Sequence, residues 1–491
     1  MWSTPVLLSI YSALSLIVHG LGILNAAHAV MTVRSSRAAI AWSISLISLP
    51  WIAIPLYWTL GKNKFQGYSE GLQKAYSDHR ELVHHAYSEI LEFKATLQPA
   101  FASLETITSA FSTLPFTTNN STKLLVNGQQ TYEHMLDAIA QAKHYILFQT
   151  YIIHSDDASI RFRDALVERA KEGVAVHLLY DGIGARTLSK RYIASLEEHG
   201  AIVKSFRSTK GFGRRFQINF RNHRKILIVD GDIAFMGGLN IGDEYLGKDP
   251  KFGHWRDTHL QIKGTAVKCL QRTFLADWYW ATKEVPEVSW TTRSLPAACG
   301  DQTAFILATG PADPIQSCAL FFITVINHAK ARLWIASPYF VPSTSVLNAL
   351  KLAALRGVDV RIILPNNPDQ LLVYWCSFSY YEELRQVGIQ VYRYQPGFMH
   401  QKIILCDRDI AGVGTTNLDN RSFFLNFEAM TFILNEGVDT SKDESEFIDS
   451  VEQMLIDDLD SCKLVDLEKY QHRPFWFKLA ARISRLLAPI L

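Results

Sequence analysis

The chain has 491 residues, of which 48% are hydrophobic and 20% are charged. This length is enough for two to four domains with a large apolar core. The formal net charge is only +2, so the overall charge does not indicate a nucleic-acid partner. The cysteines form no Cys-x-x-Cys pair, so neither a zinc site nor a disulfide framework is predicted.

Two long uncharged segments lie near the N-terminus, from Pro5 to Val33 and from Ala38 to Gly61. Each exceeds the ~20 residues that a helix needs to span a bilayer, so residues 1–66 are predicted to form two transmembrane helices of a multi-pass protein. A buried globular hairpin is the alternative. A signal peptide is disfavoured, because no Lys or Arg precedes the first segment. Basic residues are more numerous after the second segment than between the two, which favours a cytoplasmic body.

Residues 67–118 have a charged helical pattern that predicts a connector between membrane and body. The body then repeats itself. AKHYILFQTYII from Ala142 matches AKARLWIASPYFV from Ala329, and KEGVAVHLLYDG from Lys171 matches LRGVDVRIILPN from Leu355. Each copy follows the order strand, helix, strand, helix, strand, which is typical of an α/β fold. We predict two tandem α/β halves, residues 119–290 and 291–459, that face each other as a pseudo-dimer.

Each half contains one copy of a polar motif, in NHRKILIVDGDIAFMGGLN and in MHQKIILCDRDIAGVGTTN. The separations from His to Lys, from Lys to Asp and from His to Asn are identical in the two copies. Two such matches at equivalent places in a repeat do not arise by accident. The motif residues are His223, Lys225, Asp230 and Asn240 in the first half, and His400, Lys402, Asp407 and Asn417 in the second.

The spacing predicts how these side chains point. Residues two apart in a strand share a face, so His223 and Lys225 project together. Asp230 belongs to the same catalytic motif, but an odd spacing turns it to the opposite face, where it would fix the end of the strand. The Asp230-Gly231 step predicts a hairpin turn, and the returning strand would bring Asn240 back toward His223.

Two imidazoles, two ammonium groups and two amides suit chemistry on a phosphodiester. One His can attack phosphorus to give a phosphohistidine, while the other protonates the leaving alcohol. Lys and Asn would bind the phosphate oxygens, and no metal or other cofactor is expected. Each His also needs an orienting acceptor. Asp257 and Glu428, at corresponding places after the Asn, are predicted to serve, with solvated surface acids as the alternative.

The duplicated motif resembles that of the phospholipase D superfamily. The segments FRNHRKILIVDG, GGLNIGDEYLG, SPYFVP, GFMHQKIILCD and TTNLDNRSFFLNFE are similar to bacterial cardiolipin synthases, and the likeness covers nearly the whole chain. This resemblance implies two phospholipase D-like halves and phosphatidyl transfer between two phosphatidylglycerol molecules at the inner (cytoplasmic) membrane. It implies His223 as nucleophile and His400 as general acid. A small departure is Thr309, where Ser is expected.

The motifs leave the acceptor open. Water would make the protein a phospholipase D-type hydrolase, and phosphatidylethanolamine could replace one donor. Nucleases share the superfamily, but the membrane segments argue against a nucleic-acid partner. A non-catalytic membrane scaffold is the alternative from another class, and the intact double motif argues against it.

Two further segments are predicted to meet lipid. In the tail, residues 460–491, the sequence PFWFKLAARISRLLAPIL predicts a basic amphipathic helix on anionic lipid, with a helix docked on the body as the alternative. The segment before the first motif mixes Arg, Lys and Phe and predicts a mouth for anionic headgroups, or else a solvated basic loop. Its residues are Phe206, Arg207, Lys210, Phe212, Arg214, Arg215, Phe216, Phe220 and Arg221.

Overall fold

A computed structural model describes residues 4–33, 35–61, 65, 67–207, 219–291, 299–436, 444–466, 469 and 472–490. The chain divides into a small unit, Met1–Gly67 with Ser208–Phe220, and a large unit, Tyr68–Arg207 with Arg221–Leu491. Most of the basic segment predicted to bind headgroups, including Lys210, Arg214 and Arg215, lies outside the described residues.

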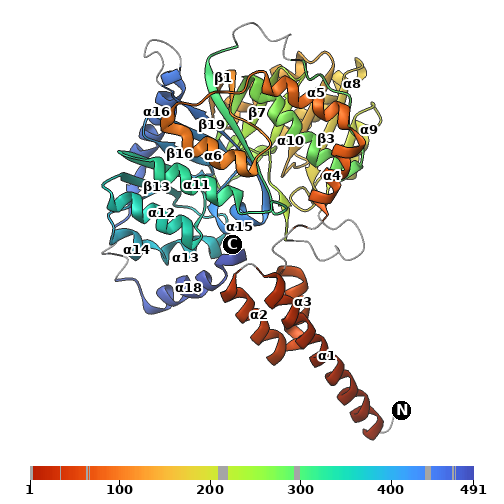
Figure 1. Cartoon of the computed structure of the whole chain (residues 1–491), viewed down its shortest axis with the longest axis vertical. Coiled ribbons are helices and arrows are strands. Elements are labelled where there is room, and N and C mark those ends of the chain that lie inside the picture. The colour runs from red at the N-terminus through yellow and green to blue at the C-terminus, as the bar shows by residue number, and fades with distance from the viewer. Residues whose placement is uncertain are drawn as a thin grey trace. The chain divides into compact units, whose positions relative to one another are not determined.

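The small unit is built from three helices, α1 (Thr4–Thr32), α2 (Ser36–Ser48) and α3 (Pro50–Leu60) (Figure 1). Small and apolar side chains from all three helices pack together, among them Ala29, Leu46 and Ile54. The Nδ1 atom of His28 lies 2.7 Å from the hydroxyl of Tyr57, which links α1 to α3. Residues Leu8–Thr32 of α1 are long and apolar enough to cross a membrane.

The second uncharged segment does not form one long helix. It is divided between α2, with 13 residues, and α3, with 11. The break falls at Leu49, whose backbone is non-helical (φ −135°, ψ 55°), because Pro50 has no N–H to continue the hydrogen-bond ladder and instead begins a new helix. At about 1.5 Å per residue, neither helix reaches the ~30 Å of a bilayer core. Within the described ranges the structure therefore supports one spanning helix, and does not support a multi-pass arrangement.

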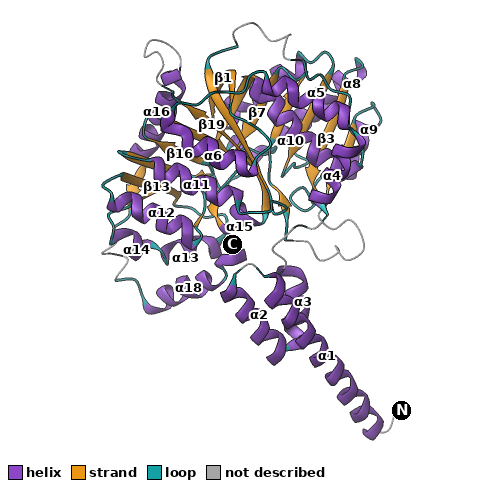
Figure 2. Ribbon diagram, in the orientation of Figure 1, coloured by secondary structure: helices purple, strands orange, loops and turns teal. Residues whose placement is uncertain are grey.

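The large unit contains one long twisted sheet to which both halves contribute (Figure 2). In sheet order, half one supplies β1 (Thr117–Val126), β9 (Thr258–Gly264), β7 (Ile233–Gly237), β6 (Ile226–Val229), β2 (Tyr145–Thr150), β3 (Ala175–Asp181) and β4 (Ile202–Phe206). Half two supplies β10 (Gln302–Thr309), β19 (Asn426–Leu434), β17 (Ile410–Gly414), β16 (Ile403–Cys406), β11 (Arg332–Ala336), β13 (Asp359–Pro365), β14 (Gln390–Tyr394) and β20 (Cys462–Leu464).

The strand order confirms the internal repeat. Read outward from the centre, the first seven strands of each half correspond one to one, and the halves meet where β1 pairs antiparallel with β10. Within half one, β2, β3 and β4 are parallel, and β6 and β7 form the predicted hairpin. The equivalent strands of half two, β11, β13 and β14, are also parallel. The prediction of two tandem α/β halves is confirmed.

Helices cover the sheet and complete one apolar core in each half. Half one has α7 (Asn127–Ala140), α8 (Asp157–Lys171), α9 (Lys190–Glu197) and α10 (Thr265–Thr282). Half two has α11 (Ser317–His328), α12 (Thr344–Leu355), α13 (Leu371–Phe378), α14 (Tyr381–Arg385), α15 (Asn420–Phe424) and α16 (Glu444–Asp460), and the tail adds α18 (Phe475–Leu486).

The segment predicted as a connector forms α4 (Tyr68–Asp78), α5 (Arg80–Leu91) and α6 (Ala102–Phe111). These helices belong to the large unit. The buried hydroxyl of Tyr68 donates to Asp277 of α10 at 2.6 Å, and Leu104 of α6 is buried in the core of half two. The segment is therefore packed on the body along much of its length.

Candidate active site

Two very short pairs of parallel strands place the motif histidines. Strand β5 (Arg221–Asn222) of half one pairs with the start of β19 in half two. Strand β15 (Phe398–Met399) of half two pairs with β8 (Trp255–Arg256) of half one. The next backbone N–H in each case continues the pairing: that of His223 donates to the Phe427 carbonyl at 2.9 Å, and that of His400 to the Arg256 carbonyl at 2.8 Å. Each histidine therefore lies beside the next residue of the strand it pairs with, which is Glu428 for His223 and Asp257 for His400.

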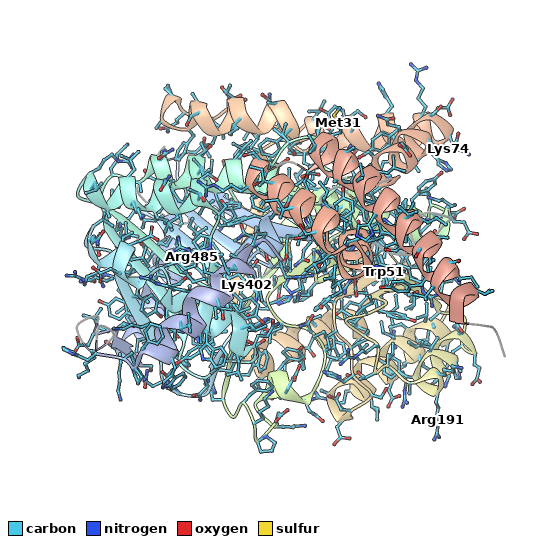
Figure 3. All side chains as sticks on the ribbon, turned by 90° about the horizontal axis from the view of Figure 1, so that it is seen from below. Met31, Trp51, Lys74, Arg191, Lys402 and Arg485 are labelled. Carbon is cyan, nitrogen blue, oxygen red and sulfur yellow. The ribbon has the colours of Figure 1, made fainter. Side chains whose placement is uncertain are left out.

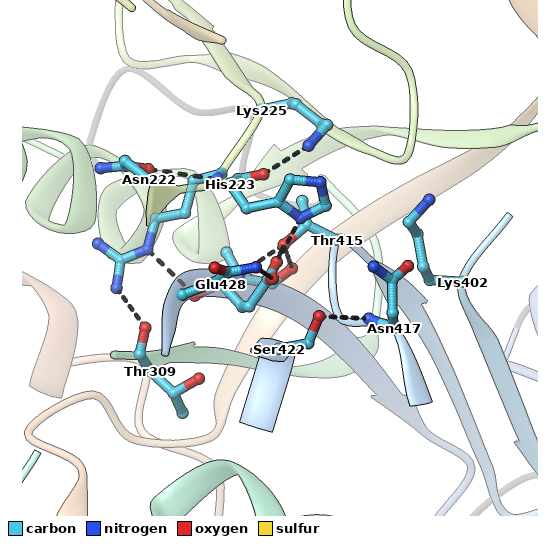
Figure 4. Close-up of polar contacts among 12 residues, drawn as sticks. Asn222, His223, Lys225, Thr309, Lys402, Thr415, Asn417, Ser422 and Glu428 are labelled. Carbon is cyan, nitrogen blue, oxygen red and sulfur yellow. Dashed lines mark hydrogen bonds and ion pairs between the residues drawn. The ribbon is translucent and has the colours of Figure 1, made fainter. Parts of the chain in front are cut away.

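That following residue is the predicted acidic acceptor. The Nδ1 atom of His223 lies 2.9 Å from the Glu428 carboxylate, and Nδ1 of His400 lies 2.8 Å from that of Asp257 (Figure 4 shows the first pair). Both carboxylates are completely buried. An ionised carboxylate can only accept, so Nδ1 of each ring carries the proton and Nε2 keeps its lone pair. The sequence predicted both acids, and the structure adds that each serves the histidine of the other half.

Further polar groups hold these carboxylates. The Thr415 hydroxyl donates to Oε2 of Glu428, and the Asn426 amide donates to Oε1 at 3.1 Å. Asp257 accepts from its neighbour Thr258 through the backbone N–H at 2.8 Å and from the Trp255 indole at 3.3 Å. The two halves therefore orient their acids with different side chains, although the His–acid geometry is the same.

Both histidines line one cavity of about 250 Å³. Asn240 and Asn417 also line it, as does Arg221 from the end of the segment predicted to meet anionic headgroups. The other lining side chains were not predicted from the sequence: Tyr151, Ile152, Glu244, Tyr245, Phe252, Trp255, Tyr339, Asp369, Gln370, Val373, Asp419, Arg421 and Asn426. Tyr151 and Tyr339 lie just after equivalent strands of the repeat, β2 and β11, which was the one signal in the sequence for their place. The cavity joins the two halves into a single site.

The motif aspartates do not line this cavity. The Asp230 carboxylate accepts from the backbone N–H groups of Lys143, His144 and Tyr145 at 2.8–2.9 Å. Asp407 accepts in the same way from residues 330–332. Each aspartate has a positive φ, in the turn between the two strands of its hairpin. They anchor the neighbouring strand from the turn itself, and not from the opposite face of a continuing strand.

Each motif lysine points back to its own histidine. The ammonium group of Lys225 donates to the His223 carbonyl at 2.6 Å and lies 5.3 Å from the centre of the Tyr151 ring. Lys402 donates to the His400 carbonyl. Neither lysine is among the lining residues of the cavity. The amide of Asn240 is held by the Ile152 N–H and the Tyr245 hydroxyl.

The residue between His and Lys is an anchor in both halves. Arg224 donates to both carboxylate oxygens of Asp277 on α10, at 2.8 and 2.9 Å, and to the Thr309 carbonyl at 3.0 Å. Gln401 donates to Asp458 on α16 at 2.7 Å. A buried charge needs such a partner. These contacts fix the backbone from behind, while the flanking His and Lys point toward the site.

Charge and burial together set the protonation of the site. Burial lowers the pKa of His223 to about 4, with Lys225 and Lys402 adding to the effect against Glu428. Burial likewise lowers the pKa of His400 to about 4, aided by Lys402 and opposed by Asp257. Burial also lowers the pKa of Lys402 to about 8. At neutral pH both imidazoles are therefore neutral in the free protein.

The two carboxylates keep their charge despite their burial. Burial by itself raises the pKa of Asp257, but His400 and Lys402 outweigh it and hold that pKa below its usual value. Burial by itself also raises the pKa of Glu428, but His223 and Lys225 outweigh it and hold that pKa below its usual value. Within the described part of the chain, no cluster of three or more His, Cys, Asp or Glu side chains is arranged to hold a metal ion.

Comparison with known proteins agrees with this site. Residues 135–278 and 322–454, one stretch from each half, match the family described as "Cardiolipin synthase, PLD-like domain". The chain is 41% identical to a cardiolipin synthase A of Pseudomonas fluorescens, over 98% of both chains. It is 42% identical to one of Pseudomonas aeruginosa, over 96% of this chain and 94% of the relative.

A solved structure shares the fold. The crystal structure of a phosphatidylserine synthase from Haemophilus influenzae superposes with a TM-score of 0.60, covering 79% of this chain and all of that one at 14% identity. The two matched stretches contain both His-x-Lys-x4-Asp motifs and both acids. The chain belongs to the cardiolipin synthase family of phospholipase D-like proteins.

Proposed function

We propose that the protein transfers a phosphatidyl group from one phosphatidylglycerol to another, giving cardiolipin and glycerol. One observation carries the proposal: two histidines, each oriented by a buried carboxylate of the opposite half, line a single cavity. Such a pair can supply a nucleophile and a proton donor at the same phosphorus. The choice of a phospholipid as the substrate rests on the similarity to the cardiolipin synthases named above.

The first step forms a covalent intermediate. Nε2 of His223 attacks phosphorus, the bond from phosphorus to the glycerol oxygen breaks, and His400 gives that oxygen its proton. In the second step a hydroxyl of another phosphatidylglycerol loses its proton to His400 and attacks phosphorus, and the phosphorus–His223 bond breaks. Glu428 and Asp257 stabilise whichever imidazole carries positive charge.

The substrate itself supplies the protonation that the first step needs. In the free protein the pKa of His400 is about 4, lowered first by burial and then by Lys402. An anionic phosphodiester in the cavity offsets the charge of the lysines and favours the protonated imidazole. Lipid binding therefore shifts His400 toward the protonated form that the first step needs.

The phosphate charge is met by cations from both halves. Arg221 and Arg421 line the cavity, and we assign Lys225 and Lys402 to phosphate stabilisation through their field. Asn240 and Asn417 are assigned to phosphate and headgroup contacts. The Oδ1 atoms of Asn417 and Asn426 find no hydrogen-bond partner among the described residues. As acceptors, they suit the hydroxyl groups of a glycerol headgroup.

We place the protein at the inner membrane, with α1 as its attachment and lipid, rather than nucleic acid, as its partner. The proposed division assigns residues 1–66 to membrane attachment, 67–118 to the helical connector, 119–290 and 291–459 to the two halves, and 460–491 to the tail. The apolar length of α1 supports the attachment.

Product analysis tests the function. The purified protein would be given phosphatidylglycerol alone, and then with phosphatidylethanolamine, and the lipids would be identified by mass spectrometry. We expect cardiolipin and free glycerol from the first mixture. Phosphatidic acid as the sole product would make the protein a hydrolase, and no turnover of either lipid would favour a scaffold.

A further inference from the structure

The tail helix α18 has three distinct faces. Successive residues of an α-helix lie about 100° apart around its axis, which separates the side chains of α18 into a buried row, a basic row and an apolar row. The buried row is Phe477, Ala481 and Ser484. The helix is therefore not simply amphipathic, because Phe477 faces the body while most of the large apolar residues lie on another side.

The buried row docks α18 on half two. The Phe477 ring lies 5.2 Å from that of Phe378, at the end of α13. Arg485 donates to the Ser379 carbonyl at 3.1 Å and to the Glu383 carboxylate at 2.7 Å. Figure 3 looks onto this side of the large unit, with Arg485 labelled. The position of α18 on the body is thus fixed by packing and by an ion pair, as the alternative for the tail predicted.

The apolar row points away from the body. It contains a Trp, a Phe and branched aliphatic residues, and Phe475 and Leu486 are 78% and 79% exposed. Scattered exposed apolar residues are ordinary, but a continuous row of large ones along a helix marks an interaction surface. We call this row the apolar ridge; its residues are Phe475, Trp476, Leu479, Ile483 and Leu486.

Basic side chains run alongside the apolar ridge. Lys478 and Arg482 lie one step around the helix from it, and Arg482 is exposed. No acidic residue occurs between Phe475 and Leu486. Large apolar side chains next to cations are what an anionic bilayer surface attracts, because the headgroups bind the cations and the acyl boundary takes the ridge.

The helix is also joined to the wall of the active site. Gln370 and Val373 line the catalytic cavity, and between them Leu371 and Leu372 at the start of α13 are exposed. After α18, the Ala488 carbonyl accepts from the Asn420 amide at 2.9 Å. Asn420 stands between two lining residues of the cavity. The helix therefore packs against α13, which carries part of the cavity wall (Figure 1). The short 3-10 helix that follows it, Ala488–Ile490, contacts α15.

We propose that the apolar ridge of α18 inserts into the surface of an anionic bilayer and holds the mouth of the catalytic cavity against it. The ridge would act in addition to α1, which is long and apolar enough to cross a membrane. Docking here would bring exposed Leu371 and Leu372 to the lipid surface beside the cavity. A substrate headgroup could then enter without its acyl chains leaving the bilayer.

Photo-crosslinking tests the contact directly. The full chain would carry p-benzoylphenylalanine at position 479 on the ridge, or at position 355 on α12 as a matched exposed-leucine control. Each protein would be reconstituted in vesicles of phosphatidylcholine with phosphatidylglycerol and irradiated. We expect at least tenfold more lipid adduct at 479 than at 355. Equal labelling at both positions, or a crosslink from 479 to a second copy of the chain, would overturn the proposal.

An activity comparison tests the consequence, and this part rests on the proposed function. The triple variant W476S/L479S/I483S should lose at least tenfold in turnover of phosphatidylglycerol in vesicles. On dispersed short-chain phosphatidylglycerol, the turnover of this variant should stay within twofold of that of the unmodified protein. The control variant L352S/L355S should stay within twofold on both forms of the substrate. Equal losses on both substrate forms would contradict a docking role. An unmodified protein inactive on both forms would refute the proposed function, while leaving the crosslinking result to stand.

Discussion

The Nδ1 atom of His223 lies 2.9 Å from the carboxylate of Glu428, a residue 205 positions later in the chain. The reciprocal contact joins His400 to Asp257 at 2.8 Å. Both contacts cross between halves, so neither half contains a histidine together with the acceptor that orients it. The following predictions test what this exchange and its surroundings do.

The substitution Glu428→Gln should lower kcat/KM by about 100-fold or more, an order of magnitude typical of lost orienting partners. A glutamine amide can donate to Nδ1, which would move the imidazole proton to Nε2 and block attack on phosphorus. Steady-state kinetics would measure the loss, and an unchanged melting temperature would show that the fold is intact. Asp257→Asn should behave alike. Near-normal turnover in both variants would mean that the acids are not needed.

The nucleophile can be identified by trapping. With a phosphatidyl donor that has a p-nitrophenol leaving group, departure needs no acid, so His400→Asn should still form an adduct. Because that variant lacks the base for the second step, the adduct should accumulate on His223, where peptide mass spectrometry would find it. His223→Asn should give none. An adduct on His400 in the latter variant would reverse the two roles.

The motif aspartates should matter through stability. Asp230→Asn replaces a charged acceptor of three backbone N–H groups by a neutral one, and should cost about 1–3 kcal/mol of unfolding free energy. Thermal unfolding of the purified protein would report it. Asp232→Asn, two residues away and exposed, is the control. A variant of normal stability that had lost all turnover would place Asp230 in the chemistry instead.

The dependence of kcat on pH should be bell-shaped with a broad top, because kcat reports the lipid-bound protein, in which the phosphodiester favours protonated His400. His223 has a pKa of about 4, lowered mainly by burial, so its attacking nitrogen is blocked only as the pH falls toward that value. Burial lowers the pKa of Lys402 to about 8, so its charge is lost as the pH rises past that value. Activity should therefore fall below about pH 5 and above about pH 8. A profile still rising at pH 9 would contradict the role of Lys402.

Chelators should leave this profile unchanged, because every proton transfer and every charge contact in the proposed steps is assigned to a side chain. Rates would be measured with and without EDTA at a fixed lipid-to-detergent ratio, so that effects on lipid aggregation are held constant. A strict requirement for an added divalent cation under those conditions would contradict the two-histidine mechanism.

Local patterns predicted much of the site. The repeat located His223 and His400, the Asp230-Gly231 step predicted the β6–β7 hairpin, and strand alternation turned Asp230 away from the cavity. The last two inferences use residues within a single copy of the motif, and the first needs only the match between the two copies. Asp257 and Glu428 were identified from corresponding places in the repeat, which requires no knowledge of how the halves meet.

Features that depend on the association of the halves were not predictable in this way. The crosswise His–acid contacts follow from β5 pairing with β19 and β8 pairing with β15, and no local pattern specifies which half a two-residue strand will join. Likewise, Arg421 lines the same cavity as Arg221 of the other half only because the two halves associate. The second membrane segment illustrates a different limit: composition predicted one spanning helix, whereas Pro50 divides the run into α2 and α3.

The exchange of short strands also limits how this chain can vary in evolution. A one-residue slip of β8 against β15 would carry Asp257 away from His400 while leaving the sequence of both motifs intact. A substitution that shifts either short strand in one half would therefore displace the acid from the histidine of the other half. A gene encoding a single half would specify an inactive protein unless two copies assembled and exchanged these same strands.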